Sequence, residues 1–312
     1  MKLRNPLPLT LALFTTTALG ACQSQDTAER DEASSMDRDS TSAAVDVVAR
    51  DFVFDAPDTI GSGWTTIRFT NSGTQTHFVV LHRLPPDKTL NDWAAAVAAP
   101  FDSAWGGLQA GTMTKAEAGK VIASMLPSWY GDVEERGGVG LVAPGHSAQA
   151  TMNLSPGTYV LECYVKTPKD LQFHVGLGMA HQLTVTASDS NEQPPKADLD
   201  ITFADGKMDA PSEVSSGRHV VAVHYRWQSE MGMGNDVNVA QLPDGTTAED
   251  LVPWMDWMNV HGLEAPAPAT FVGGVQEAPE GSTAYFTVDL TPGRYAWAVE
   301  NGQGIVQPFS VQ

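Results

Sequence analysis

The chain has 312 residues, 42% of them hydrophobic, and a formal net charge of −19 at pH 7. This length allows about two domains with substantial cores. So strong a negative charge argues against binding to nucleic acid and against electrostatic binding to anionic lipid, because phosphate groups repel an acidic surface.

The N-terminal residues are typical of an export signal. Lys2 and Arg4 precede a mostly apolar run over residues 7–18, which is too short to span a bilayer well. The run ends in Leu19-Gly20-Ala21-Cys22, which resembles the lipobox of bacterial lipoproteins. An ordinary cleaved signal whose site happens to contain a cysteine is the alternative.

The lipobox resemblance implies that residues 1–22 form a signal peptide ending at a lipidated Cys22. Acyl chains on that cysteine would anchor an exported bacterial protein to the membrane. Gln23 follows instead of Asp, so in a Gram-negative host we expect the periplasmic face of the outer membrane. Residues 23–44 are polar and charged, and we expect a disordered tether there.

Three sequence blocks recur in the same order later in the chain. The blocks beginning near Phe52, at Leu84 and at Gly137 are matched by blocks beginning at Ile201, Leu242 and Gly273. Self-similarity of this kind predicts two copies of one domain. We expect these copies over residues 45–187 and 197–312, joined by a short linker over residues 188–196.

Each copy is predicted to be mainly β-structure. Segments such as TTIRFT and TYVLECYV are rich in β-branched and aromatic residues and are separated by turn residues. Thr89 with Asp92, and Thr247 with Asp250, predict a helix start in each copy. A further helix is expected from Thr114 to Met125 as an insertion in the first copy. Strands of this spacing favour an all-β fold of two Greek-key sandwiches.

The first copy resembles the cupredoxin family of blue copper proteins. The residues that carry the resemblance are Asn71-Ser72-Gly73 before His77, Pro156-Gly157-Thr158-Tyr159 before Cys163, then His174 and Gly178-Met179. The resemblance covers most of residues 45–187 and, through the repeat, more weakly 197–312. It implies one copper ion with His77, Cys163, His174 and Met179 as ligands.

The chemistry of these residue types agrees with that ligand set. A thiolate and two imidazoles form a trigonal plane that suits both copper oxidation states, and a thioether is a weak axial ligand. Cys163 has no partner for an internal disulfide if Cys22 belongs to the signal. However, the loop over residues 164–173 is longer than in small electron-transfer cupredoxins. A copper-free domain, with Cys163 as a small buried hydrophobe, is the alternative.

The second copy is predicted to lack a blue copper site. Val299-Glu300-Asn301 stands where the ligand loop should begin, and Asn235 aligns with His77. A different group resembles the Cu(I) ligands of periplasmic copper-handling proteins, because thioethers suit soft Cu(I). It comprises His224, Trp227, Met231 and Met233. The alternative is a loop whose methionines fill an interface.

Two-domain cupredoxins include copper nitrite reductases, which need a histidine immediately before the cysteine. That position is Glu162 here, although His82 keeps the spacing from His77 that those enzymes use. We therefore expect no enzyme. The sequence predicts a lipid-anchored, extracytoplasmic copper protein for electron transfer or copper handling, with a redox or copper-transfer protein as partner. A copper-free interaction or ligand-binding lipoprotein is the alternative.

Overall fold

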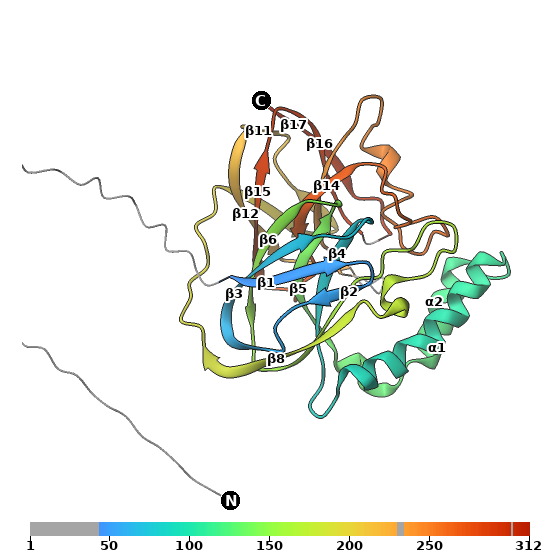
Figure 1. Cartoon of the computed structure of the whole chain (residues 1–312). Coiled ribbons are helices and arrows are strands. Elements are labelled where there is room, and N and C mark those ends of the chain that lie inside the picture. Colours follow the sequence, from blue (N-terminus) through green and yellow to red (C-terminus); the bar gives the residue numbers. More distant parts are fainter. Residues whose placement is uncertain (1–43, 230–233, 301) are drawn as a thin grey trace, which may run out of the picture. The chain divides into compact units, whose positions relative to one another are not determined.

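The computed structural model describes residues 44–229, 234–300 and 302–312 (Figure 1). Seventeen strands and two α-helices lie in these residues, with three short 3-10 turns. The all-β fold with a helical insertion in the first copy is thereby confirmed. None of the described helices is long and apolar enough to cross a membrane.

The first copy contributes eight strands. They are β1 (Val45–Arg50), β2 (Val53–Asp55), β3 (Thr59–Asn71), β4 (His77–Arg83), β5 (Glu134–Val142), β6 (Ser147–Leu154), β7 (Gly157–Glu162) and β8 (Ala180–Asp189). Alternation of apolar and polar residues sets their faces, as in β3, where Ile67 and Phe69 are buried and Arg68 is exposed.

The second copy contributes nine strands in the same succession. They are β9 (Leu199–Ala204), β10 (Lys207–Asp209), β11 (Glu213–Val214), β12 (Gly217–Tyr225), β13 (Val237–Gln241), β14 (Thr270–Val275), β15 (Thr283–Leu290), β16 (Gly293–Ala298) and β17 (Val306–Val311). Residues 190–198, between the two sets, contain no strand or helix.

Each copy is a two-layered sandwich with the same strand order. In the first, β2-β1-β3-β6 form one layer and β8-β7-β4-β5 the other. The start of β3 crosses over to pair with β8 in parallel. In the second, β10-β9-β12-β15 and β11-β17-β16-β13-β14 repeat that order. The two copies therefore have one topology, as the sequence repeat predicts.

Both layers continue from one copy into the other. Strand β6 pairs with β15, where Ala150 lies opposite Phe286, and β5 pairs with β14, where Val142 lies opposite Val272. The copies are thus joined by backbone hydrogen bonds along two strand edges. Sequence patterns did not predict this arrangement.

A glycine bulge occurs at the same place in both copies. Gly138 has φ 141°, and a Cβ there would lie 2.0 Å from the carbonyl oxygen of Val79. Gly274 has φ 138°, and a Cβ there would lie 1.9 Å from the carbonyl oxygen of Val237. Only glycine tolerates both the dihedral and the approach. Each bulge shifts the register of its strand pair.

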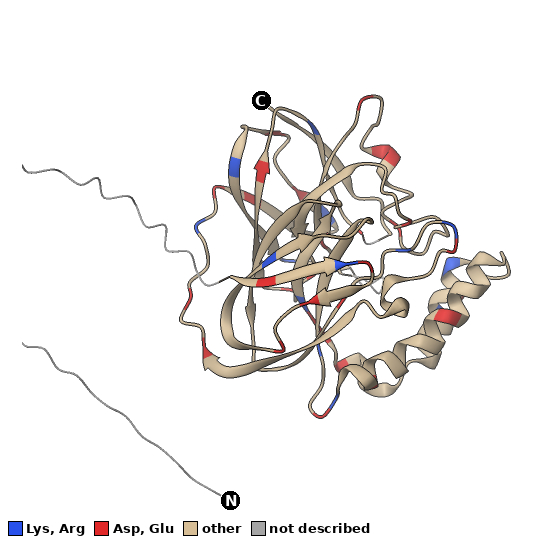
Figure 2. Ribbon diagram, in the orientation of Figure 1, with Lys and Arg blue, Asp and Glu red and all other residues tan. Residues whose placement is uncertain are grey.

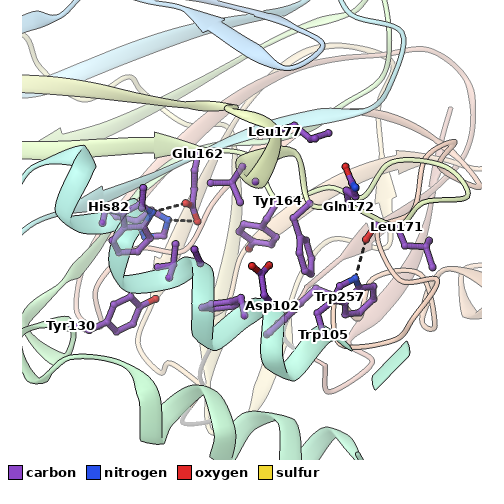
Figure 3. A pocket seen from close by; sticks show the side chains of 18 of the residues that line it. His82, Asp102, Trp105, Tyr130, Glu162, Tyr164, Leu171, Gln172, Leu177 and Trp257 are labelled. Carbon is purple, nitrogen blue, oxygen red and sulfur yellow. Dashed lines mark hydrogen bonds and ion pairs between the residues drawn. The ribbon is translucent and has the colours of Figure 1, made fainter. Parts of the chain in front are cut away.

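The insertion in the first copy is a pair of helices, α1 (Leu90–Gln109) and α2 (Lys115–Met125). Both predicted starts are confirmed, because Thr89 with Asp92 and Thr114 with Glu117 form complete capping boxes. The indole of Trp105 in α1 donates to the carbonyl of Leu171, 2.9 Å away, which ties the helix to the loop after β7 (Figure 3). The only charged residues of α1 are acidic, Asp92 and Asp102 (Figure 2).

The prediction of a helix in the second copy is wrong. Thr247 and Asp250 make the expected capping contacts, but only a 3-10 turn, η3 (Glu249–Leu251), follows. Pro253 has no N–H to donate to the carbonyl of Glu249, so the helix cannot propagate there.

Candidate metal centre

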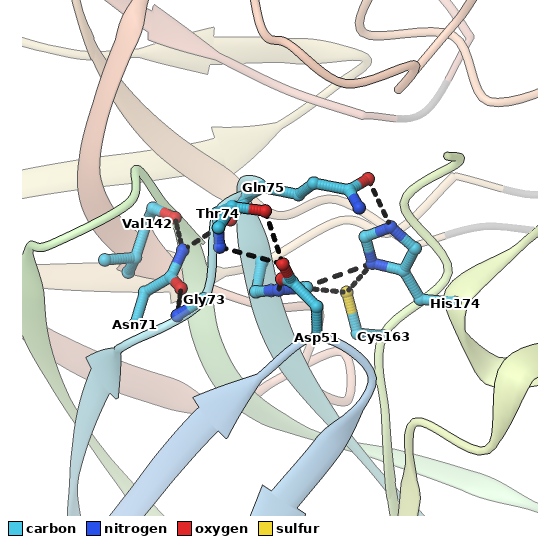
Figure 4. Close-up of polar contacts among 9 residues, drawn as sticks. Asp51, Asn71, Gly73, Thr74, Gln75, Val142, Cys163 and His174 are labelled. Carbon is cyan, nitrogen blue, oxygen red and sulfur yellow. Dashed lines mark hydrogen bonds and ion pairs between the residues drawn. The ribbon is translucent and has the colours of Figure 1, made fainter. Parts of the chain in front are cut away.

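Three of the four residues proposed as copper ligands, His77, Cys163 and His174, lie on three segments that meet at one end of the first sandwich (Figure 4). His77 begins β4, Cys163 directly follows β7, and His174 begins the 3-10 turn η2 (His174–Leu177). All three side chains are fully buried. The structure thus brings together a thiol and two imidazoles that are distant in sequence.

The three donor atoms form a triangle suited to one metal ion. Cys163 Sγ lies 3.7 Å from His77 Nδ1 and 3.6 Å from His174 Nδ1, and the two nitrogens are 3.1 Å apart. A triangle with these sides has its circumcentre about 2.0 Å from each corner, and metal bonds to imidazole nitrogen and thiolate sulfur measure about 2.0–2.3 Å. Among the described residues, this is the only group of three or more His, Cys, Asp or Glu in which one ligand atom from each residue lies within 4.8 Å of all the others.

Hydrogen bonds at the far side of each ring orient both histidines. Nε2 of His77 lies 2.7 Å from Asp51 Oδ1, and Nε2 of His174 lies 3.1 Å from Gln75 Oε1. Since these oxygens accept hydrogen bonds, each Nε2 carries the proton and each Nδ1 turns a lone pair toward the centre. Sequence analysis missed Asp51 and Gln75.

The predicted Asn-Ser-Gly loop explains how Asp51 reaches the site. The side chain of Asn71 donates to the carbonyls of Gln75 and Val142, both at 2.8 Å, and accepts from the amide of Gly73. A Cβ on Gly73 would lie 2.3 Å from Asp51 Oδ1. Glycine at this position therefore leaves room for the carboxylate beside His77.

The long ligand loop closes despite its extra residues. The amide of Cys163 donates to the carbonyl of Met179 (3.3 Å), and the amide of Met179 donates to the carbonyl of His174 (3.0 Å). The additional residues of this loop form contacts with the second copy. Lys166 donates from its backbone amide to Leu263, and its ammonium group donates to carbonyls of Trp257 and Asn259.

Met179 is fully buried, and its backbone lies against Cys163. Its position just before β8 is that of the predicted axial ligand. The role of its thioether as that ligand stays a prediction.

The electrostatic environment favours neutral ring ligands and a protonated thiol. Burial raises the pKa of the Cys163 thiol to about 12, although hydrogen bonds from the amides of Phe78 and Val165 lower it in part. Burial and the neighbouring His77 lower the pKa of His174 to about 3. Burial also lowers the pKa of His77, although Asp51 opposes it. A metal ion binding here would have to displace one proton, that of the thiol.

The donor set fits copper. A soft thiolate with two imidazoles in one plane suits both Cu(I) and Cu(II). The cluster His77–Cys163–His174 is therefore one that can bind copper.

The equivalent positions in the second copy hold neither a thiol nor an imidazole. Val80 pairs with Glu162 in the first copy as Asn238 pairs with Ala298 in the second. By this register, Asn235 takes the place of His77, and Val299 takes the place of Cys163.

The second proposed cluster is only partly described. In β12, the ring nitrogens of His224 contact Thr283 Oγ1 (3.0 Å) and Asp200 Oδ1 (2.9 Å). Trp227 packs against the core. Met231 and Met233 lie outside the described residues, so a Cu(I) site there stays a prediction.

No protein-family model and no curated protein matches this sequence. Among solved structures, the chain is similar to an auracyanin from the photosynthetic bacterium Roseiflexus castenholzii at 22% identity, covering 45% of this chain and 94% of that one, with a TM-score of 0.26. It is similar to auracyanin A, a blue copper protein from Chloroflexus aurantiacus, at 20% identity, covering 46% and 98%, with a TM-score of 0.28. A blue copper oxidase from Nitrosomonas europaea matches at 14% identity over 85% of each chain, with a TM-score of 0.24.

By its own strand order, this chain has a tandem cupredoxin-like fold. Its first copy holds the cluster that can bind copper, and its second copy keeps the topology without the corresponding thiol and imidazoles.

Proposed function

We propose that the protein is an exported, lipid-anchored copper protein that transfers electrons or handles copper. The observation that carries this proposal is the triangle of Cys163 Sγ and the Nδ1 atoms of His77 and His174, with sides of 3.1–3.7 Å. Met179 is the proposed axial ligand. When bound, copper supplies one-electron chemistry by alternating between Cu(I) and Cu(II).

The protein's own residues hold the ligand geometry fixed. Asp51 and Gln75 fix the two rings, and the backbone bonds among Cys163, His174 and Met179 fix the loop. Such a buried and constrained set suits electron transfer, because little rearrangement accompanies a change in oxidation state.

We propose electron transfer or copper handling over catalysis. A catalytic second metal next to Cys163 would need ligands at Glu162 and His82. Instead, His82 lies between two carboxylates, with Nδ1 2.5 Å from Glu135 and Nε2 3.0 Å from Glu162. Because both ring nitrogens are engaged in ion pairs, this histidine has no lone pair directed at a shared centre.

The test is copper loading of the purified protein. We expect one copper per chain and an absorption band near about 600 nm, typical of thiolate bound to Cu(II). Cys163→Ser should lose both, with an unchanged circular dichroism spectrum. The matched control is Cys22→Ser, which replaces the chain's only other cysteine and should keep both. A colourless wild type that binds no more copper than Cys163→Ser would favour the copper-free interaction module.

The same two variants also test the lipid anchor, with Cys22→Ser now as the test and Cys163→Ser as the control. Cys22→Ser should move the protein from the membrane fraction to the soluble fraction, while Cys163→Ser should stay membrane-bound. Retention of Cys22→Ser on membranes after a high-salt wash would contradict the anchor.

A further inference from the structure

A cavity of about 620 Å³ lies between helix α1 and the first sandwich, and Trp257 and Glu277 of the second copy also line it (Figure 3). None of the proposed copper ligands lines it. Its mouth includes exposed residues such as Asp102, Gln172 and Leu177, and its floor includes the buried Trp93 and Glu162. The volume is within the range of about 300–1,000 Å³ that is typical of small-molecule sites.

Aromatic rings make up much of the wall. The aromatic lining residues are Trp93, Phe101, Trp105, Tyr130, Tyr164, Phe173 and Trp257. Trp93 stacks on Tyr130 with ring centroids 5.3 Å apart, and Trp105 packs on Phe173 at 5.1 Å. Lys166 Nζ already lies 4.0 Å from the ring centroid of Trp105 and 5.5 Å from that of Phe173, so a ligand would use other rings of the wall, such as Phe101 and Trp257.

The charges of the lining are almost all negative. Five acidic residues line the cavity, with one histidine and no lysine or arginine: Asp102, Glu135, Glu162, Asp170 and Glu277, with His82. Burial would lower the pKa of His82, but Glu135 and Glu162 raise it well above its ordinary value. The imidazolium balances only one of those two carboxylates, so the cavity keeps a net negative charge.

Glu277 has a buried carboxyl group with no side-chain partner among the described residues. It is 4% exposed and lines the cavity, and its carboxyl group accepts a hydrogen bond from its own backbone amide but forms none with the side chains of the other described residues. Burial and the carboxylates of Glu135 and Asp236 raise its pKa well above the ordinary value. A buried polar group left without a partner is costly, and a ligand that donates to it removes that cost.

We propose that this cavity binds a small organic cation. Its ammonium group would donate hydrogen bonds to Glu277 and Glu135, and its hydrocarbon body would lie against the rings of Phe101 and Trp257, which line the cavity with centroids 5.8 Å apart. Cation–π attraction and the unbalanced carboxylates both favour this class of ligand. The inference goes beyond copper binding and does not depend on it.

The probe for this site is benzylammonium, titrated into the copper-free full-length protein. Binding is followed by calorimetry and by tryptophan fluorescence, since three lining residues are tryptophans. We expect saturable binding of the cation, weaker binding of neutral benzyl alcohol and none of benzenesulfonate. Absence of saturable cation binding up to about 10 mM, or equal binding of the sulfonate, would overturn the proposal.

Two substitutions locate the site. Ala98→Trp fills the cavity from α1, and the control Ala99→Trp adds the same ring at the neighbouring exposed residue, which does not line it. We expect Ala98→Trp to abolish binding and Ala99→Trp to retain it. Glu135→Gln removes one of the two carboxylates beside His82 and should weaken cation binding at least tenfold without changing benzyl alcohol binding. Equal behaviour of the two tryptophan variants, or unchanged cation binding in Glu135→Gln, would refute the site; circular dichroism confirms that each variant is folded.

Discussion

The hydrogen bond between Asp51 and His77 predicts a large effect of one charge on a bound copper ion. Burial would raise the pKa of Asp51, but hydrogen bonds from Thr74 and His77 lower it, so the group is a carboxylate at neutral pH. A negative charge near the metal stabilises Cu(II) relative to Cu(I). Asp51→Asn should therefore raise the reduction potential.

The magnitude follows from the distance. The carboxylate oxygen is 2.7 Å from Nε2 of His77, and the imidazole ring and a metal bond bring the total to roughly 6–7 Å. At an effective dielectric constant of about 20, one unit charge at that distance contributes about 2–3 kcal/mol, or about 100 mV for one electron. The Asp51 side chain is 19% exposed, so salt screens part of this, and we expect a rise of about 50–100 mV.

The assay is a redox titration that follows the blue absorption band. The matched control is Asp55→Asn, which removes the same charge from an exposed residue that contacts Arg50 and no ligand. We expect the control to differ from the wild type by less than about 20 mV, because exposed charges are well screened. A fall in potential for Asp51→Asn, or an equal shift in both variants, would refute the reasoning.

Three further outcomes are expected. Copper affinity should rise about tenfold per pH unit between about pH 7 and 9, because binding releases one proton from Cys163 while both histidines are already neutral. A copper affinity that does not change with pH, measured by competition with a chelator, would contradict this. Gly138→Ala should cost more than about 2 kcal/mol in urea unfolding, because its Cβ meets Val79, whereas Gly119→Ala, in open space on α2, should be neutral or stabilising. Burial raises the pKa of Asp236 to about 7, so its contribution to the free energy of unfolding is complete below about pH 4 and falls as pH rises toward 7. Asp236→Asn should therefore flatten the dependence of the free energy of unfolding on pH in this range. An unchanged dependence would exclude this residue as its source.

The parts predicted from sequence are those written in local patterns or in ligand order. The capping boxes at Thr89 and Thr114 need only four residues each, and both formed as expected. The thiol and two imidazoles were found because their order along the chain follows a family pattern. The strand alternation and the repeated blocks likewise predicted two sandwiches of one topology.

The parts that sequence could not predict depend on contacts between distant segments. Asp51 precedes His77 by 26 residues, and no local pattern marks their hydrogen bond. The cavity exists because α1 packs against the loop that contains Leu171. In the second copy, Thr247 makes the expected capping contact with Asp250, but the predicted helix does not form because Pro253 interrupts it.

The pairing of β5 with β14 and of β6 with β15 gives the second copy a role that needs no metal. Without it, two long strands of the first copy would present unpaired amides and carbonyls to solvent, and such open edges recruit other chains into aggregates. A duplicated sandwich can therefore lose its metal ligands and still be retained by selection, because it pairs with the edge strands of the other copy. It also follows that the two halves should melt together, and that a truncated first copy should precipitate rather than behave as a small autonomous blue protein.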